Sequence, residues 1–240
     1  MRFFPSRRKR LAPDESSKTP EDRSNPKKQV EPQLSAGNQA VPTGDAEVKA
    51  DAPDPQRLGP YNEGEAPKDS MFFDAGVMRI PVINGLHITP VTGETDSILA
   101  LELVSGTAQM QGAVCAMQRS GGLWDEIRQQ LAEQLESEEY RIFPLPGPFG
   151  EAVLARPIPG GKSDVEGALP LLLWGVEGDR WLLRVILRGQ AAEEESARQD
   201  LLKILHGMEI VRGDEAHMPG EFIPIRLAPD LREQLGACWQ

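Results

Sequence analysis

The chain has 240 residues, of which 26% are charged, and its formal net charge is −11. Twelve of the 26 Lys and Arg residues and twelve of the 37 Asp and Glu residues lie in residues 1–70, so the whole negative excess falls in residues 71–240. An acidic domain of this kind argues against broad affinity for nucleic-acid phosphates, which requires clustered Lys and Arg.

The two cysteines are too few for a disulfide framework, and as free thiols they suit a reducing compartment. The sequence contains no run of 18 apolar residues that would predict a transmembrane segment. Its first ten residues lack the apolar stretch of a signal peptide. We therefore expect a cytoplasmic protein.

Residues 1–58 are expected to form a disordered, Pro-rich tail, because residues 1–70 contain ten of the 21 prolines and few aromatic residues. The tail begins with a basic cluster. This cluster comprises Arg2, Arg7, Arg8, Lys9 and Arg10. Such residues could bind an anionic membrane or nucleic acid. Without a lipid or an amphipathic helix they anchor weakly, so a solvated terminus is the preferred interpretation.

The remaining residues, 59–240, are expected to form a single α+β domain. Val77–Pro81 and His87–Val91 flank Asn84-Gly85, which predicts a β-hairpin. The pattern then predicts strands at Ser97–Val104 and Ala108–Gln118.

A helix is predicted at Leu123–Glu136, with an apolar stripe at helical spacing and acidic residues in its first turn. Strands are predicted at Tyr140–Leu145 and Glu151–Ile158, and a second helix at Glu193–His206. Glu209–Arg212 is expected to add a strand, and a short helix is predicted at Pro229–Leu235.

The segment 169–189 is the strongest strand signal in the chain. Two apolar runs meet at Gly178-Asp179, which predicts a two-residue turn with Glu177 facing Arg180 and Val176 facing Trp181. One side of this hairpin would be free of charge. That side comprises Leu172, Trp174, Val176, Trp181, Leu183, Val185 and Leu187. Such a hairpin belongs near the centre of an antiparallel sheet.

The opposite side of this hairpin carries Arg180, Arg184 and Arg188, which the alternation of a strand points in one direction. They could form a site for a small anion. Because buried arginines need partners, ion pairing with an acid is the preferred interpretation. The candidate acids are Asp125, Glu126 and Glu209.

We expect no catalytic, cofactor or metal residues. Gly160-Gly161-Lys162-Ser163 resembles the end of a phosphate-binding loop, but no helix follows it, so a turn is predicted instead. The three histidines lack the spacing of metal ligands. Arg212-Gly213-Asp214 is interpreted as a turn, and Trp124, Trp174 and Trp181 as core residues.

Several sequence blocks together resemble one family. The blocks are Gly59-Pro60-Tyr61-Asn62, Asp74-Ala75-Gly76 with Arg79-Ile80-Pro81, Gly122–Arg128, Gly147–Glu151, Gly175–Gly178 with Arg180-Trp181, and Val211–Glu215. In this order they resemble the actinobacterial family called domain of unknown function 3710, with Asn62 standing where Asp is expected. The resemblance implies an actinobacterial cytoplasmic protein and no activity. The order of elements is also similar to that of the Mog1/PsbP α/β/α sandwich.

The function expected from the sequence is a non-catalytic binding or scaffolding module with a protein partner. One alternative is an enzyme or small-anion binder that uses the arginine-lined face. Another is a peripheral membrane or nucleic-acid adaptor that acts through residues 2–10.

Overall fold

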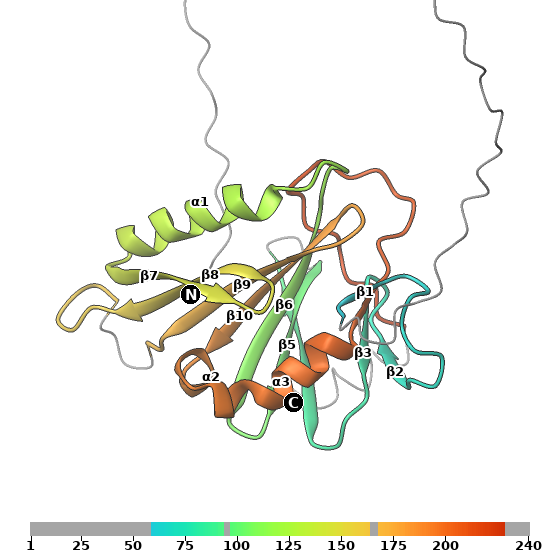
Figure 1. Ribbon diagram of the computed structural model, residues 1–240, viewed down its shortest axis with the longest axis horizontal. Coiled ribbons are helices and arrows are strands. Elements are labelled where there is room, and N and C mark those ends of the chain that lie inside the picture. The colour runs from blue at the N-terminus through green and yellow to red at the C-terminus, as the bar shows by residue number, and fades with distance from the viewer. Residues whose placement is uncertain (1–58, 94–96, 164–167, 229–240) are drawn as a thin grey trace, which may run out of the picture. The chain divides into compact units, whose positions relative to one another are not determined.

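The computed structural model describes residues 59–93, 97–163 and 168–228 (Figure 1). These residues belong to the compact unit Ala50–Gln240, and the unit Met1–Lys49 lies outside them. The predicted tail, its basic cluster and the predicted helix at Pro229–Leu235 also lie outside the described residues. What is described is an α+β fold, as the sequence predicts.

Seven antiparallel strands form the main sheet. In spatial order they are β4 (Leu86–Thr92), β5 (Ile98–Ser105), β6 (Ala108–Ala116), β10 (Trp181–Arg188), β9 (Leu171–Glu177), β8 (Gly150–Pro157) and β7 (Tyr140–Gly147). β10 is therefore the central strand, which confirms the placement predicted for the hairpin. Pairing follows the chain order in two runs, β4-β5-β6 and β7-β8-β9-β10, and β6 joins β10 between them.

A second sheet has four short strands. Its spatial order is β1 (Tyr61–Asn62), β11 (Glu209–Ile210), β3 (Met78–Pro81) and β2 (Phe72–Asp74), with β1 and β11 parallel. The hairpin predicted around Asn84-Gly85 is wrong, because β3 pairs with β2 and β11 whereas β4 pairs with β5 in the main sheet. Gly85, with a φ of 79°, turns the chain from one sheet to the other.

Helices cover both faces of the main sheet (Figure 1). α1 (Leu123–Ser137) packs against β7, β8 and β9. The other face carries α2 (Gln190–Glu193) and α3 (Glu195–Gly207). The sequence predicts one helix from Glu193, but Glu194 is extended, with φ −106° and ψ 126°, and separates two helices. This three-layer arrangement agrees with the expected α/β/α sandwich.

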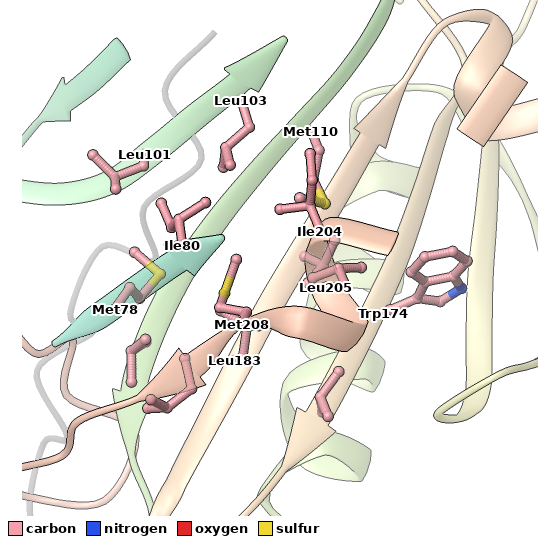
Figure 2. Packing of buried hydrophobic residues seen from close by; sticks show 14 of the residues in the cluster. Met78, Ile80, Leu101, Leu103, Met110, Trp174, Leu183, Ile204, Leu205 and Met208 are labelled. Carbon is pink, nitrogen blue, oxygen red and sulfur yellow. The ribbon is translucent and has the colours of Figure 1, made fainter. Parts of the chain in front are cut away.

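The main hydrophobic core lies between the sheets and α3. Figure 2 shows Ile204 and Leu205 of α3 among Met78 and Ile80 of β3 and Met110 of β6. All seven residues predicted for the uncharged side of the hairpin belong to this core. The prediction of faces is therefore confirmed.

The register of the hairpin differs from the prediction by two residues. Val176 faces Leu183 and Glu177 faces Leu182, so the turn centres on Asp179-Arg180. The N–H of Gly178 donates to the carbonyl of Trp181 at 2.9 Å and closes this turn. A Cβ on Gly178 would lie 2.0 Å from the indole of Trp181, so that ring occupies the space of a side chain. Gly178 is thus required by packing, and Arg180 adopts the left-handed conformation instead, with a φ of 62°.

β9 also fixes the start of α1. Glu177 accepts the N–H groups of Trp124 at 2.7 Å and Gly122 at 2.9 Å, so its carboxylate caps a helix that has no cap from its own side chains. The Trp124 ring lies directly against Gly175, where a Cβ would approach to 2.2 Å. The sequence Gly175-Val176-Glu177-Gly178 therefore holds α1 and the turn together.

Both edge strands of the main sheet contain proline. Pro90 lies in β4, and Pro144 and Pro146 lie in β7. Proline has no N–H to donate to a further strand, so it is tolerated at the edge of a sheet. Pro144 and Pro146 are two residues apart, so both missing donors belong to the same side of β7.

Candidate functional site

The structure does not bring the three predicted arginines into one site. Arg180 lies in the turn, Arg184 in the middle of β10, and Arg188 at the end of that strand. Neighbouring members of the set are four residues apart, which is about 13 Å along an extended strand, and each one has different contacts.

Arg184 is buried, with 5% of its surface exposed, and it lies beneath an aromatic ring. Its guanidinium carbon is 4.8 Å from the centre of the Phe222 ring. Burial lowers the pKa of Arg184, and the neighbouring Cys115 opposes this shift. Burial in turn raises the pKa of the Cys115 thiol to about 11, which makes it an inert core residue.

Two of the three acids predicted as partners of Arg184 bind other cations, and Glu126 forms no ion pair with Arg184. Asp125 pairs with Arg128 at 3.2 Å, and the buried Glu209 pairs with Arg79 at 2.7 Å. The hydrogen bond that Arg79 donates to Glu209 raises the pKa of Arg79. Among the described residues, no carboxylate pairs with Arg184, and its Nε has no hydrogen-bond acceptor. The ion-pair interpretation is therefore wrong for Arg184, which instead has a cation–π contact with Phe222.

Arg188 has an acidic partner, although a different one. It lies 3.7 Å from Glu102 and donates to the amide oxygen of Gln111 at 3.2 Å. Both partners lie on strands of the same sheet, β5 and β6. Arg188 thus fits the ion-pair interpretation.

Arg180 lines an open pocket of about 230 Å³, which neither of the other two arginines lines. Asn62 fixes one wall of this pocket, because its Oδ1 accepts the N–H of Asp179 and the indole N–H of Trp181, each at 2.9 Å. Arg212, from the segment after β11, also lines the pocket. Two arginines from distant parts of the chain therefore meet at one pocket.

Acidic side chains surround the same pocket. Glu63, Asp179 and Asp214 line it together with Arg180 and Arg212. Three carboxylates against two guanidinium groups leave the rim slightly negative. The site is therefore suited to a partner that presents charges of both signs.

A second pocket, of about 280 Å³, adjoins the first and shares the Arg212-Gly213-Asp214 segment with it. Arg212 Nη1 donates to the backbone carbonyls of Gly213, at 2.8 Å, and Glu215, which orders this segment as the predicted turn. His217 also lines the second pocket, and its Nε2 has no hydrogen-bond partner in the part of the chain that the structure describes. We call the two pockets together the Arg212 site.

Sequence reasoning missed Asn62, Arg212 and His217 as members of a site. Asn62 was notable only as a departure from the expected Asp, and Arg212 only as part of a turn. The carboxamide oxygen of Asn62 accepts the two hydrogen bonds that an Asp carboxylate would also accept. No local pattern could have indicated its role, because Asn62 and Trp181 are 119 residues apart.

The loop that resembles a phosphate-binding motif has a structural role. Ser163 is buried, donates to the carbonyl of Glu139 at 2.6 Å and accepts the N–H of Ile158 at 3.1 Å. The backbone N–H of Lys162 donates to the Glu139 carboxylate. Within residues 59–93, 97–163 and 168–228, no group of three or more His, Cys, Asp or Glu side chains could hold a metal ion. The helices in these ranges are also too short or too polar to cross a membrane.

The fold and this site define an α+β protein with a charged pocket at the turn of its central hairpin and a second pocket beside it. A family described as proteins of unknown function (DUF3710) matches residues 59–234, and the chain belongs to this family. No curated protein matches the sequence. A crystal structure from Bacteroides thetaiotaomicron VPI-5482 is similar with a TM-score of 0.33 and 14% identity, covering 71% of this chain and 58% of that one. A similarity of this size carries no argument.

Several of the blocks on which the family resemblance rests meet at the Arg212 site. Asn62, Gly76 and Trp181 come from three of these blocks, and Arg212 to Glu215 from a fourth. They lie far apart in the chain and are brought together by β1, β10, β11 and the segments beside them. No single helix or strand contains these blocks, so their shared place at the Arg212 site is a feature of the tertiary structure.

Proposed function

We propose that the chain is a non-catalytic, cytoplasmic binding module that engages a partner protein through the Arg212 site. One observation carries the proposal: the three arginines do not share a cavity, because the Phe222 ring covers Arg184 and Arg188 is paired with Glu102, which leaves only Arg180 at a pocket. An enzyme acting on a small anion would need those arginines to open into a cavity.

The charge of the Arg212 site favours a polypeptide over a small anion. Three carboxylates and two arginines line the first pocket, and the ordered domain itself is acidic. A free anion would be repelled by this field, whereas a protein segment with both acidic and basic side chains can pair with each group in turn. The shape of two adjoining pockets suits consecutive side chains of such a segment.

Three finer statements belong to the same proposal. The buried thiol of Cys115 supports a reducing, cytoplasmic location. An actinobacterial origin rests on the resemblance of the sequence blocks. The domain boundary at residue 59 is proposed from the composition. Binding of an anionic membrane or nucleic acid through Arg2, Arg7, Arg8, Lys9 and Arg10 is a separate proposal, because these residues lie outside the described residues.

The test compares partners captured by matched variants in the native host, with quantitative mass spectrometry. Arg180→Asn removes the charge while keeping a residue that tolerates a positive φ. We expect this variant and Asp214→Asn to lose the same partner, which Arg141→Gln, an exposed charge change on β7, retains. A partner that all three variants retain equally would place the interface elsewhere. Turnover of a small anion by the purified protein would overturn the non-catalytic part of the proposal.

A further inference from the structure

Three tryptophans lie buried in the described domain, and only two of their indole N–H groups have acceptors. Trp124 donates to the carbonyl of Glu151 at 2.7 Å, and Trp181 donates to Asn62 at 2.9 Å. Trp174 is 3% exposed, and its Nε1 has no acceptor among the described residues. A buried indole N–H normally finds a partner, so an unpaired one indicates a missing acceptor.

Trp174 lines a pocket of about 300 Å³ that is separate from the Arg212 site. Figure 2 shows the indole nitrogen on the side of the ring that is turned away from Ile204 and Leu205, at the border of the core. The ring of Phe149 contacts Trp174 edge to face, with centroids 5.8 Å apart, and holds its orientation. The donor is therefore fixed, and it lies at a pocket instead of within the packed core.

The walls of this pocket come from the β7–β8 turn, β9 and α3. Pro146 and Leu202 are among its apolar residues. A Cβ at Gly147 would lie 3.1 Å from the indole nitrogen, so the lack of a side chain at this position leaves room beside the donor. The wall of the pocket thus combines apolar side chains with one fixed donor.

A positive group lies on the helix side of the same pocket. Arg198 lines the pocket. Its Nη1 donates to the carbonyls of Ala191 and Ala192 at 3.1 and 3.2 Å, and these bonds anchor the guanidinium. Its other donors make no hydrogen bond with the described residues. α3 begins one turn earlier, at Glu195, without a side-chain cap. The exposed Glu195 is the one carboxylate of the lining.

We propose that this pocket binds a small apolar carboxylate, with the carboxylate oxygen accepting from Trp174 Nε1 and pairing with Arg198. The apolar body of the ligand would pack against Pro146 and Leu202. Hydrogen bonds to an ionised acceptor are the stronger kind, and a site of this volume is at the small end of ligand pockets. The proposal does not depend on the Arg212 site, which lies at the other end of the central hairpin.

The test uses benzoate as the probe and the indole N–H resonances of the ¹⁵N-labelled full chain as the readout. We expect the Trp174 resonance to shift saturably, while those of Trp124 and Trp181 stay in place as internal controls. Benzamide, which keeps the acceptor and loses the charge, should bind about tenfold more weakly, and toluene more weakly still. Equal binding of toluene, or no saturable shift with millimolar benzoate, would overturn the proposal.

Three variants separate this role from a merely structural one. Arg198→Met should weaken benzoate binding about tenfold or more, and Trp174→Phe, which keeps a ring against Phe149 but lacks the reporting resonance, should weaken it similarly when binding is measured by calorimetry. Glu195→Gln removes a repelling charge and should tighten binding severalfold. A weaker affinity in Glu195→Gln would mean that the pocket selects a cation or a donor, and the carboxylate proposal would then be wrong.

Discussion

At the scale of single residues, the unusual group is a cation buried without a carboxylate. Arg184 is in the central strand of the sheet, under Phe222, and the transfer of a guanidinium from water to such a place is costly. The cation–π contact recovers part of that cost. The domain therefore keeps Arg184 at some expense to its stability.

Arg184→Met keeps much of the volume and removes the buried charge. We expect the free energy of unfolding, measured with urea, to stay unchanged or rise by about 1–2 kcal/mol, since apolar replacement of buried charges is often neutral or stabilising. Phe222→Leu is the matched control, and it should cost more in the wild type than in the Arg184→Met background. A loss of more than about 1 kcal/mol for Arg184→Met would indicate that the arginine has a partner.

His206 predicts a dependence of stability on pH. Burial lowers its pKa below the usual 6.5, so the folded state favours the neutral imidazole. The unfolded chain binds the proton first as the pH falls. Its contribution is therefore complete above about pH 6.5 and is lost as the pH falls through the lower pKa of the folded state.

Urea unfolding of the wild type and His206→Gln between pH 7.5 and 5 measures this contribution. The wild type should lose more stability than the variant as the pH falls, because the carboxylates titrate in both proteins and cancel in the comparison. Parallel curves for the two proteins would show that His206 has the same pKa in the folded and unfolded states.

At the scale of elements, the central hairpin shows that the local sequence predicts which face each side chain occupies but does not predict the register of the two strands. Alternation with a period of two assigns each side chain to a face, and Leu172, Trp174 and Leu183 lie in the core as predicted. The register depends on the turn, and here Trp181 covers Gly178 while Asn62 binds the turn from far along the chain. Both contacts are tertiary, so the local Gly-Asp signal placed the turn one residue early.

The dependence on tertiary contacts also explains the other predictions that were wrong or incomplete. Asn84-Gly85 is a good turn sequence, but whether its flanking strands pair depends on partners elsewhere, here β2 and β11 for β3. Glu193 and Glu195 both suit the first turn of a helix, so nothing local indicated a break at Glu194. Arg180, Asn62 and Arg212 come from separate parts of the chain, and the sequence could predict only the first of them as a site residue.

Trp181→Ala tests the energetics of the hairpin. Trp181 is 2% exposed and bonded to Asn62, so truncation should cost about 3–5 kcal/mol of unfolding free energy. Trp181→Phe keeps most of the apolar contact and loses the hydrogen bond, and it should cost clearly less. Denaturant midpoints at a constant slope measure both, and a mild Trp181→Ala would mean that the ring contributes little to the core.

At the scale of the whole molecule, the described order begins at residue 59 with backbone pairing. The N–H of Gly59 donates to the carbonyl of His206 at 2.9 Å, and that of Tyr61 to the carbonyl of Met208 at 2.8 Å, so the first described residues are joined to the end of α3 and the residue after it. A variant lacking residues 1–58 should keep the melting midpoint of the full chain within a few degrees. A larger fall would show that the removed segment stabilises the domain.

The basic cluster at residues 2–10 has its own test. Replacement of Arg2, Arg7, Arg8, Lys9 and Arg10 by Ala should leave co-sedimentation with anionic vesicles, and gel shifts with nucleic acid, unchanged at both low and physiological salt. This result is expected because five charges without a lipid or an amphipathic helix anchor weakly. Binding by the wild type that the variant lacks, and that salt weakens, would instead support the adaptor role.

The prolines of β4 and β7 have a consequence for the behaviour of this protein in a crowded cell. A seven-stranded sheet with two open rims would be a template on which further chains could add strands and grow into fibrils. Pro90 on one rim, and Pro144 and Pro146 on the other, interrupt the row of donors that such growth requires. The addition of strands from other copies is therefore disfavoured at both rims.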